Sequence, residues 1–291
     1  MNGLLVIIIF FVLLGGLWAA WKHFRVKAKV AIVSLVKEPH NLKTWVEYHK
    51  NRMGIDRFYL FADDDDEKFD TGDLSVTVLK RWKDRLGFKY DESKDAPENV
   101  RERQRLAFEE GMRMAEKEGV VYLAHIDSDE LLWGPNKVAD ALDKYPDAGS
   151  FHMQNEELAP EKMDMENCFE EGTKFHSDPS RFTAYGNGKA IGVVGRSSWN
   201  GPHYLKSEEP LVEIPREELR VLHYPSCNLK ETIKRAKQYG QFEDNSAGWS
   251  DHHRMTRDAL ADCDDDCEEK ARGVFEKRMA NGSAITIQAI P

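Results

Sequence analysis

The segment HIDSDELLW, from His125 to Trp133, places three acidic side chains within four residues, between two apolar stretches. Crowded in a desolvated place, Asp127, Asp129 and Glu130 would raise one another's pKa and resist ionising unless a cation neutralised them. Carboxylate oxygens suit Mg²⁺ or Mn²⁺, and such an ion can grip a diphosphate and stabilise the charge that develops when the diphosphate leaves. We therefore predict that Asp127 and Asp129 bind a divalent metal ion.

The bare Asp-x-Asp pattern is uninformative, because it recurs in two other acidic runs, 63–66 and 262–266. Context separates the three places. Only the pair Asp127 and Asp129 both follows a predicted buried strand directly, Val120 to Ile126, and is followed by an apolar Leu-Leu-Trp. The alternative interpretation is that Asp127, or the serine after it, caps the N-terminus of a following helix.

Strands and helices alternate along the chain before this segment. Hydrophobic periodicity predicts a strand ending at Val36, a helix closed by Gly54, the strands RFYLFA and LSVTVLKRW, and a long helix through Ala107. This alternation predicts an α/β fold with a mainly parallel sheet and helices on both faces. Such sheets bind ligands outside the carboxyl ends of their strands, where the acidic segment lies.

Three later segments, AGSFHMQ, KAIGVVG and LRVLHY, are predicted to be further strands. Between them, Asn155 to Lys189 has an irregular pattern rich in Glu, Met and Gly, which is typical of a substrate-facing insertion. From Leu229 onward the chain is predicted to be helical, with a polar helix from Asp251 to about Met279.

The N-terminus carries an uncharged apolar run, Gly3 to Trp21, which at 1.5 Å per residue spans the roughly 30 Å hydrocarbon core of a bilayer. We predict a single transmembrane helix and basic juxtamembrane segment over 1–29, a catalytic domain over 30–250 and a polar helical tail over 251–291. A cleaved signal peptide is the alternative, although the run has no basic segment before it. The basic residues after the run favour a cytoplasmic catalytic domain, whereas the glycosylation sequon Asn281-Gly282-Ser283 would matter only in a lumen.

The composition bears on partners and on redox chemistry. The 291-residue chain has a formal net charge of -10, which argues against nucleic acid as a partner because nucleic-acid binders gather Lys and Arg against phosphates. Four cysteines are too few for a disulfide-stapled scaffold. Cys263 and Cys267 have no second Cys pair or nearby His pair at zinc-binding spacing, so a solvated acidic helix is predicted there.

In their order, these motifs resemble those of nucleotide-sugar glycosyltransferases of the GT-A (Rossmann-like) fold, specifically the family-2-like and family-92-like group (domain of unknown function 23). The matching features are LVKEPHNLKTWVEYHKNRMGIDRFYLFADDD, a long helix opening with a Gln, a strand ending in Asp-x-Asp-Glu, Gly201-Pro202-His203, and His223-Tyr224 before LKETIKRAKQYG. The resemblance covers roughly Val30 to Phe242. It implies a membrane-anchored, metal-dependent transferase of the Golgi, the ER or another membrane, with a UDP- or GDP-sugar donor and a glycan, lipid or protein acceptor.

The resemblance also implies roles for single residues. Asp127 and Asp129 would hold Mn²⁺ or Mg²⁺ on the donor diphosphate, and His223 would be a further ligand. The nucleoside pocket would be lined from the ends of the first two strands and the start of the long helix, by Val36, Lys37, Glu38, Asp63, Gln104 and Arg105. Lys37-Glu38 stands where the group usually has Asn-Glu, a departure that bears on the base and ribose contacts.

Candidate residues for the acceptor side lie in QNEELAP. Glu156 or Glu157 would take the proton of the acceptor hydroxyl in an inverting enzyme, if it lies within hydrogen-bond reach. His203 is interpreted either as a diphosphate ligand or as a core residue.

Two other function classes compete with the transferase. The first is a metal-dependent phosphoesterase or nucleotidyltransferase that uses the same carboxylates. The second is a catalytically silent, membrane-tethered binding protein with the same fold. The intact Asp-Ser-Asp-Glu and the two downstream histidines favour the transferase.

Overall fold

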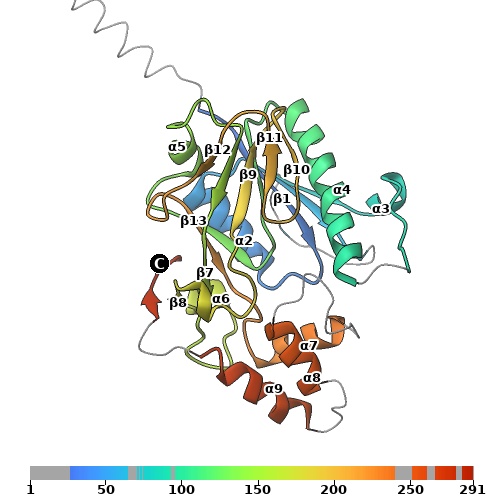
Figure 1. The fold of residues 1–291 in the computed structure, drawn as a ribbon, viewed down its shortest axis with the longest axis vertical. Coiled ribbons are helices and arrows are strands. Elements are labelled where there is room, and N and C mark those ends of the chain that lie inside the picture. Colours follow the sequence, from blue (N-terminus) through green and yellow to red (C-terminus); the bar gives the residue numbers. More distant parts are fainter. Residues whose placement is uncertain are drawn as a thin grey trace, which may run out of the picture.

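The computed structural model describes residues 27–64, 71, 73, 75–92, 96–239, 251–260, 266–279 and 284–290. Within these residues the largest element is a seven-stranded central sheet (Figure 1). Its strands, in spatial order, are β12 (Leu211–Glu213), β6 (Ser150–Met153), β9 (Lys189–Val193), β4 (Tyr122–His125), β1 (Val30–Val36), β2 (Arg57–Ala62) and β3 (Val76–Leu79). All neighbours pair in parallel except β9, which is antiparallel to both β4 and β6. The chain is therefore mixed α/β with a mostly parallel central sheet.

A second sheet of five strands lies beside the first. Its order is β14 (Ile285–Thr286), β8 (Lys174–His176), β7 (Asn155–Leu158), β13 (Arg220–His223) and β5 (Glu130–Trp133). A separate hairpin is formed by β10 (Ser197–Trp199) and β11 (Leu205–Ser207). Of the three later strands predicted, AGSFHMQ and KAIGVVG join the central sheet, whereas LRVLHY joins the second sheet as β13, between β5 and β7.

The helices of the described residues complete the fold. Their bounds are α2 (Leu42–Tyr48), η1 (His49–Met53), α3 (Trp82–Arg85), α4 (Ala96–Lys117), α5 (Val138–Leu142), α6 (Cys168–Glu171), η2 (Pro179–Arg181), α7 (Leu229–Tyr239), α8 (Asp251–Leu260) and α9 (Cys267–Glu276). The first helix is α-helical only as far as Tyr48 and continues as the single π-helical turn η1. It ends at Gly54, whose positive φ of 74° satisfies the helix C-terminus, as the sequence predicts.

Helices α2 and α4 cover opposite faces of the central sheet. Successive side chains of a strand point to opposite faces, so alternate residues of β1 enter two different cores. Ile32 packs in the core that contains Trp45 of α2, whereas Val33 packs in the core that contains Phe108 of α4. Gly111 allows α4 to lie close to β1, because a Cβ atom at that position would meet the Val33 side chain at 2.9 Å.

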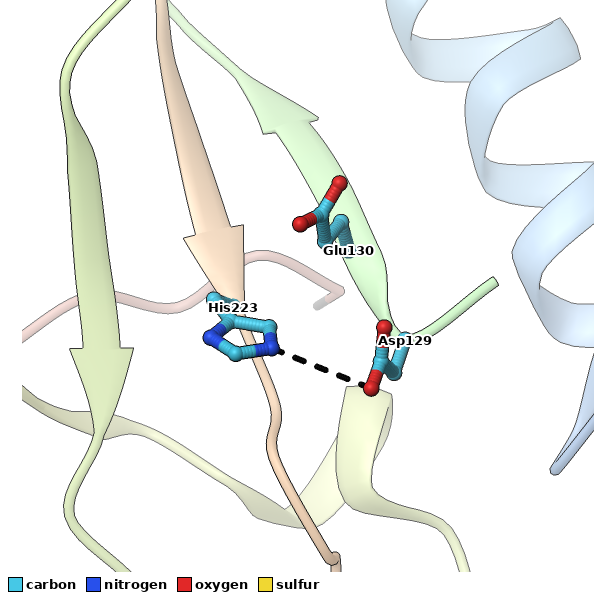
Figure 2. A group of neighbouring side chains, drawn as sticks. All are labelled: Asp129, Glu130 and His223. Carbon is cyan, nitrogen blue, oxygen red and sulfur yellow. Dashed lines mark ion pairs between the residues drawn. The ribbon is translucent and has the colours of Figure 1, made fainter. Parts of the chain in front are cut away.

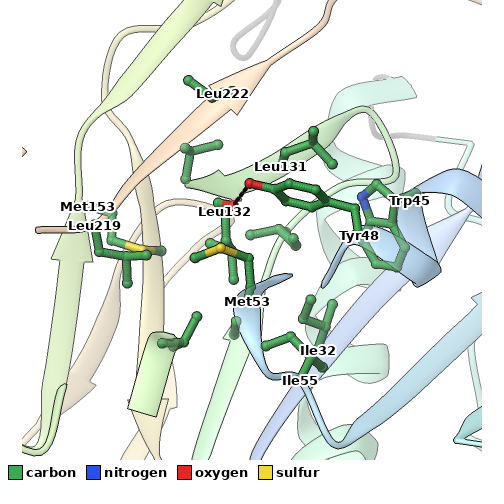
Figure 3. Packing of buried hydrophobic residues seen from close by; sticks show 14 of the residues in the cluster. Ile32, Trp45, Tyr48, Met53, Ile55, Leu131, Leu132, Met153, Leu219 and Leu222 are labelled. Atoms are coloured by element: carbon green, nitrogen blue, oxygen red, sulfur yellow. Dashed lines mark hydrogen bonds between the residues drawn. The ribbon is translucent and has the colours of Figure 1, made fainter. Parts of the chain in front are cut away.

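The larger core also joins the two sheets. Ile32 of the central sheet, Trp45 of α2 and Leu131, Leu132 and Leu222 of the second sheet belong to one cluster of buried side chains (Figure 3). The second sheet therefore packs against the central sheet, whose strands carry the predicted nucleotide site at their carboxyl ends.

The C-terminal part is helical. The polar helix predicted from Asp251 to about Met279 corresponds to two helices, α8 and α9, and α9 packs on α7 through Leu229, Ala271 and Phe275. Residues 261–265, with Cys263, lie outside the described residues, as does the sequon. The predicted anchor, Gly3 to Trp21, lies outside them too, and among the described helices none has the length and apolarity to cross a membrane.

Candidate functional site

The Asp-Ser-Asp-Glu segment is the turn that links the two sheets. β4 of the central sheet ends at His125, and β5 of the second sheet begins at Glu130. Between them the Glu130 N–H donates to the Asp127 carbonyl at 3.1 Å, and the Asp127 N–H donates to the Glu130 carboxylate at 2.8 Å. Glu130 to Trp133 pairs with β13 as a strand. The helix-capping interpretation is therefore wrong, because the residues after the turn do not form a helix.

Three side chains of α2 and η1 hold the backbone of β5 at the end of the second sheet. The Trp45 indole N–H donates to the Glu130 carbonyl at 2.7 Å. His49 Nε2 accepts from the Leu132 N–H at 3.0 Å. The Tyr48 hydroxyl donates to the Leu132 carbonyl at 2.9 Å, as Figure 3 shows. These side chains satisfy backbone N–H and C=O groups of β5 that a neighbouring strand would otherwise bind. They therefore fix the position of β5 and of the turn before it, which carries the acidic residues.

One group of potential metal ligands converges among the described residues: Asp129, Glu130 and His223 each offer an atom within 4.8 Å of the others (Figure 2). Strand pairing explains the approach, because His223 of β13 lies opposite Glu130 of β5. His223 Nε2 is 3.8 Å from Asp129 Oδ2. The histidine is 5% exposed, and its Nδ1 has no hydrogen-bond partner within the described part of the chain. The structure thus brings together two of the three predicted ligands and adds Glu130.

The pKa values of this group show a crowded acidic site. Burial raises the pKa of Glu130 to about 7, although Lys189 acts in the opposite direction. Burial lowers the pKa of His223, but Asp129 and Glu130 outweigh burial and hold it above its ordinary value. A cation bound here would favour the ionised carboxylates and the neutral imidazole.

Asp127 shares a buried ammonium with Glu130 of this group. Lys189, the first residue of β9, is 1% exposed and forms ion pairs with Asp127 and with Glu130, the latter at 3.3 Å. The other Asp127 oxygen accepts a hydrogen bond of 3.4 Å from Gln104. Burial raises the pKa of Asp127, but the nearby Lys189 and His125 together outweigh burial and hold this pKa below its ordinary value.

Tyr185 lies over the same cluster. Its hydroxyl donates to Glu130, and its ring centroid is 4.6 Å from that of His223 and 4.8 Å from that of His203. Burial, together with the nearby Glu130, raises the pKa of the Tyr185 hydroxyl well above its ordinary value, so the hydroxyl keeps its proton. His203 Nδ1 donates to the Gly188 carbonyl at 2.7 Å, and burial lowers the pKa of His203 to about 4. Its neutral ring therefore presents a lone pair at Nε2.

The two candidate acceptor bases have different surroundings. Glu156 is fully buried and pairs with Arg220 at 3.0 Å and with Arg216 at 3.5 Å. Glu157 accepts hydrogen bonds from the Thr183 N–H and hydroxyl, both at 2.6 Å, and from the Ala184 N–H at 2.9 Å. Its Oε2 is 3.9 Å from His223 Nδ1, so only Glu157 borders the metal-ligand group.

The residues predicted to contact the nucleoside occupy the carboxyl ends of β1 and β2 and the α4 helix. Asp63 is 7% exposed and forms ion pairs with Arg103 at 2.9 Å and Lys83 at 3.1 Å. Gln104 reaches Asp127, as described above. Val36 is buried in β1. The three remaining residues form ion pairs: Lys37 with Asp64 at 3.6 Å, Glu38 with Lys234 at 2.6 Å, and Arg105 with Glu102 at 2.6 Å and with Glu109 at 2.7 Å.

Sequence reasoning did not single out Lys189 or Tyr185. The available signals were a charged residue at the start of the apolar strand KAIGVVG and an aromatic residue in the glycine-containing AYGNGK. Neither signal is specific, because lysines are common at strand ends and a tyrosine is common in loops.

Comparison with known proteins gives no family. No protein-family model and no curated protein sequence matches the chain. Among solved structures it is similar to 4-diphosphocytidyl-2C-methyl-D-erythritolsynthase from Anaerococcus prevotii DSM 20548, with 10% identity, a TM-score of 0.26, and coverage of 90% of this chain and 91% of that one. It is also similar to a putative glucose-1-phosphate thymidylyltransferase from Bacillus anthracis in complex with a sucrose, with 8% identity, a TM-score of 0.25, and coverage of 57% and 71%. Such low scores carry no functional argument, so the function is argued from the site.

Proposed function

We propose that this chain is a metal-dependent glycosyltransferase that moves a sugar from a UDP- or GDP-sugar to a glycan, lipid or protein acceptor. The observation that supports the proposal best is the convergence of Asp129, Glu130 and His223 just beyond the carboxyl end of β4. Open α/β sheets bind their ligands at this edge. The resemblance of the sequence to GT-A glycosyltransferases assigns a nucleotide-sugar to the same place.

The donor set fits Mn²⁺ or Mg²⁺. Carboxylate oxygens are the preferred ligands of both ions, and His223 would add one nitrogen ligand beside the two carboxylates. The separation of 3.8 Å between His223 Nε2 and Asp129 Oδ2 is longer than a hydrogen bond, so one ion can contact both atoms after a small adjustment. The other ring nitrogen of His223, Nδ1, lies on the Glu157 side at 3.9 Å from Oε2, so Nε2 would be the nitrogen that binds the ion. The bound ion would act as a Lewis acid on the leaving diphosphate.

The protein's own groups would position the two substrates. The nucleoside would lie outside the carboxyl ends of β1 and β2, with Asp63 and its partners Arg103 and Lys83 at one side. On the acceptor side Glu157 is placed better than Glu156, because it borders His223 whereas Glu156 is held by two arginines. Proton transfer to Glu157 requires the segment 183–184 to release one carboxylate oxygen.

The disulfides support an oxidising compartment for the catalytic domain. Cys168 and Cys227 form a disulfide in the described structure, and Cys267 is also disulfide-bonded. Disulfides persist in the secretory pathway and outside the cell, and they are rare in the cytosol. We therefore place the domain on the luminal side of the Golgi, the ER or a related membrane, with Gly3 to Trp21 as the proposed anchor. This choice opposes the orientation favoured by the basic residues after that run.

The proposal is tested by calorimetric titration of the full chain, kept in detergent, with UDP and with GDP, in the presence and absence of Mn²⁺. Wild type is expected to bind one nucleotide only when Mn²⁺ is present. Asp129→Asn is expected to lose this binding, because the variant has one anionic ligand fewer. Asp147→Asn, a change of the same type at an exposed position, is the matched control and keeps wild-type binding.

Two outcomes oppose the proposal. Nucleotide binding that ignores both Mn²⁺ and Asp129→Asn would remove the metal site from the mechanism. Release of pyrophosphate from a nucleoside triphosphate and a sugar phosphate, without turnover of any nucleotide-sugar, would assign nucleotidyl transfer instead.

A further inference from the structure

Lys189 is the most deeply buried cation at the acidic turn. Its side chain is 1% exposed, and both of its ion-pair partners, Asp127 and Glu130, come from the Asp-Ser-Asp-Glu segment. The ammonium also lies 5.3 Å from the centroid of the Tyr185 ring. A buried ammonium is costly unless it is paired and hydrogen-bonded. The position of Lys189 is therefore tied to the acidic cluster, and its effect on the cluster is electrostatic.

Both oxygens of Asp127 have protein partners, as do both oxygens of Glu130, so the positions of the two carboxylates relative to Asp129 and His223 distinguish them. One oxygen of Asp127 faces Lys189, and the other accepts from Gln104 at 3.4 Å. The atoms that converge within 4.8 Å come from Asp129, Glu130 and His223, and Asp127 is outside that set. The two aspartates of the Asp-x-Asp pattern thus have different partners, although a single residue separates them.

The net charge of the acidic cluster indicates how Lys189 would affect the binding of a cation. Asp127, Asp129 and Glu130 carry three negative charges when ionised, and Lys189 offsets one of them. Two negative charges remain for one divalent cation. The interaction between charges a few ångströms apart is strong in a partly desolvated site, so a fixed ammonium has a large effect on cation affinity.

We propose that Lys189 is a positioning residue: it binds Asp127, removes that carboxylate from the ligand set, and limits the site to one divalent cation held by Asp129, Glu130 and His223. The inference rests on the metal site of the proposed function. It assigns to Asp127 an indirect role through Lys189, in place of direct coordination of the ion.

The test is a set of four proteins in which Mn²⁺ affinity is measured by calorimetry without nucleotide or sugar. Lys189→Met keeps the length of the side chain but removes its charge, so the site gains one net negative charge and binds Mn²⁺ at least tenfold tighter than wild type. Asp127→Asn loses one negative charge and binds at least tenfold more weakly. The double variant Asp127→Asn/Lys189→Met restores the wild-type balance and binds within threefold of wild type.

Direct coordination by Asp127 predicts a different pattern. In that case the double variant lacks a ligand, and it binds at least tenfold more weakly than wild type, as Asp127→Asn does. This result would overturn the inference and leave the metal site standing. Absence of Mn²⁺ binding by wild type would overturn the proposed function and the inference together.

Folding is checked separately by thermal unfolding. Lys189→Met can fail to fold, because it leaves the carboxylates of Asp127 and Glu130 without their cation, whereas in Asp127→Asn the ammonium keeps Glu130 as a partner. The double variant removes the Lys189–Asp127 pair, and Glu130 keeps its hydrogen bonds from the Tyr185 hydroxyl and the Asp127 N–H, so this variant leaves fewer buried charges uncompensated than Lys189→Met does. The Mn²⁺ affinity of the double variant, compared with that of wild type, shows by itself whether Asp127 binds the ion directly. Lys206→Met, at an exposed position of β11, is the matched control and keeps wild-type affinity.

Discussion

Acid is expected to lower the stability of the folded chain by protonating His49, which binds the backbone of β5. The ring is fully buried, donates from Nδ1 to the Trp45 carbonyl and accepts at Nε2 from the Leu132 N–H. A second proton on this ring would occupy the lone pair of Nε2, so the hydrogen bond from the Leu132 N–H would be lost. Burial is the main reason that the pKa of His49 is lowered from 6.5 to about 3, with the Trp45 hydrogen bond acting in the opposite direction.

The sign of the effect follows from proton binding. The unfolded chain takes up a proton on His49 near pH 6.5, whereas the folded chain does so only near pH 3. Stability is therefore lost as the pH falls through this interval and is fully present above it. At 1.36 kcal/mol per pKa unit, the group contributes a loss of about 2 kcal/mol between pH 7 and pH 5, and of about 5 kcal/mol once the pH is below 3.

The assay is urea unfolding of the full chain in detergent at pH 7 and pH 5, for wild type and for His49→Gln. Glutamine has a donor and an acceptor, but its shape differs from that of the imidazole, so the variant is less stable at pH 7. Because glutamine does not titrate, the free energy of unfolding of the variant falls by about 2 kcal/mol less than that of wild type between pH 7 and pH 5. His40→Gln is the control for the loss of one histidine and retains the acid sensitivity of wild type. Parallel losses for wild type and His49→Gln would refute the reasoning.

Two further predictions concern the elements around the site. Glu156→Gln leaves Arg220, whose side chain is 14% exposed, without its carboxylate partner and is expected to lower the free energy of unfolding by about 3 kcal/mol in urea titrations, because a largely desolvated charge without a partner is costly. Glu47→Gln, on the exposed side of α2, is its control, and an equal small effect of both would contradict the pairing. Removal of the Cys168–Cys227 disulfide by a double Cys→Ala change is expected to cost about 4 kcal/mol, from the chain entropy of a loop closed over 59 residues. Dithiothreitol should destabilise wild type by a similar amount and leave the double variant far less affected, and equal sensitivity of the two proteins would contradict a stabilising role for this disulfide.

The central strands and helices were predictable because local patterns determine them. The apolar run that ends at Val36 is buried on both faces, and Gly54 has the positive φ that ends its helix. The alternation of these elements is sufficient to predict a parallel sheet. The π-helical turn at His49 has no such signal, because its geometry serves hydrogen bonds to β5, which lies more than 80 residues further along the chain.

The site was predictable in part for the same reason. Asp129 and His223 were chosen because each follows or ends a predicted strand, and the pairing of β5 with β13 places them near each other. The contact of Lys189 with Asp127 depends on the insertion of antiparallel β9 between β4 and β6. No local pattern predicts that insertion, so the prediction assigned the charge balance to a metal ion alone.

The separation of Asp127 from Asp129 follows from the topology more than from the spacing of the motif. β4 stays in the central sheet, where its antiparallel neighbour β9 begins with Lys189. β5 leaves that sheet and pairs with β13, which ends with His223. In the turn between β4 and β5, Asp127 thus faces the Lys189 ammonium, Asp129 faces the His223 imidazole, and Glu130 lies between the two cationic groups. Because the strand after the motif belongs to another sheet, Asp127 stays beside the start of β9 whereas Asp129 lies beside the end of β13.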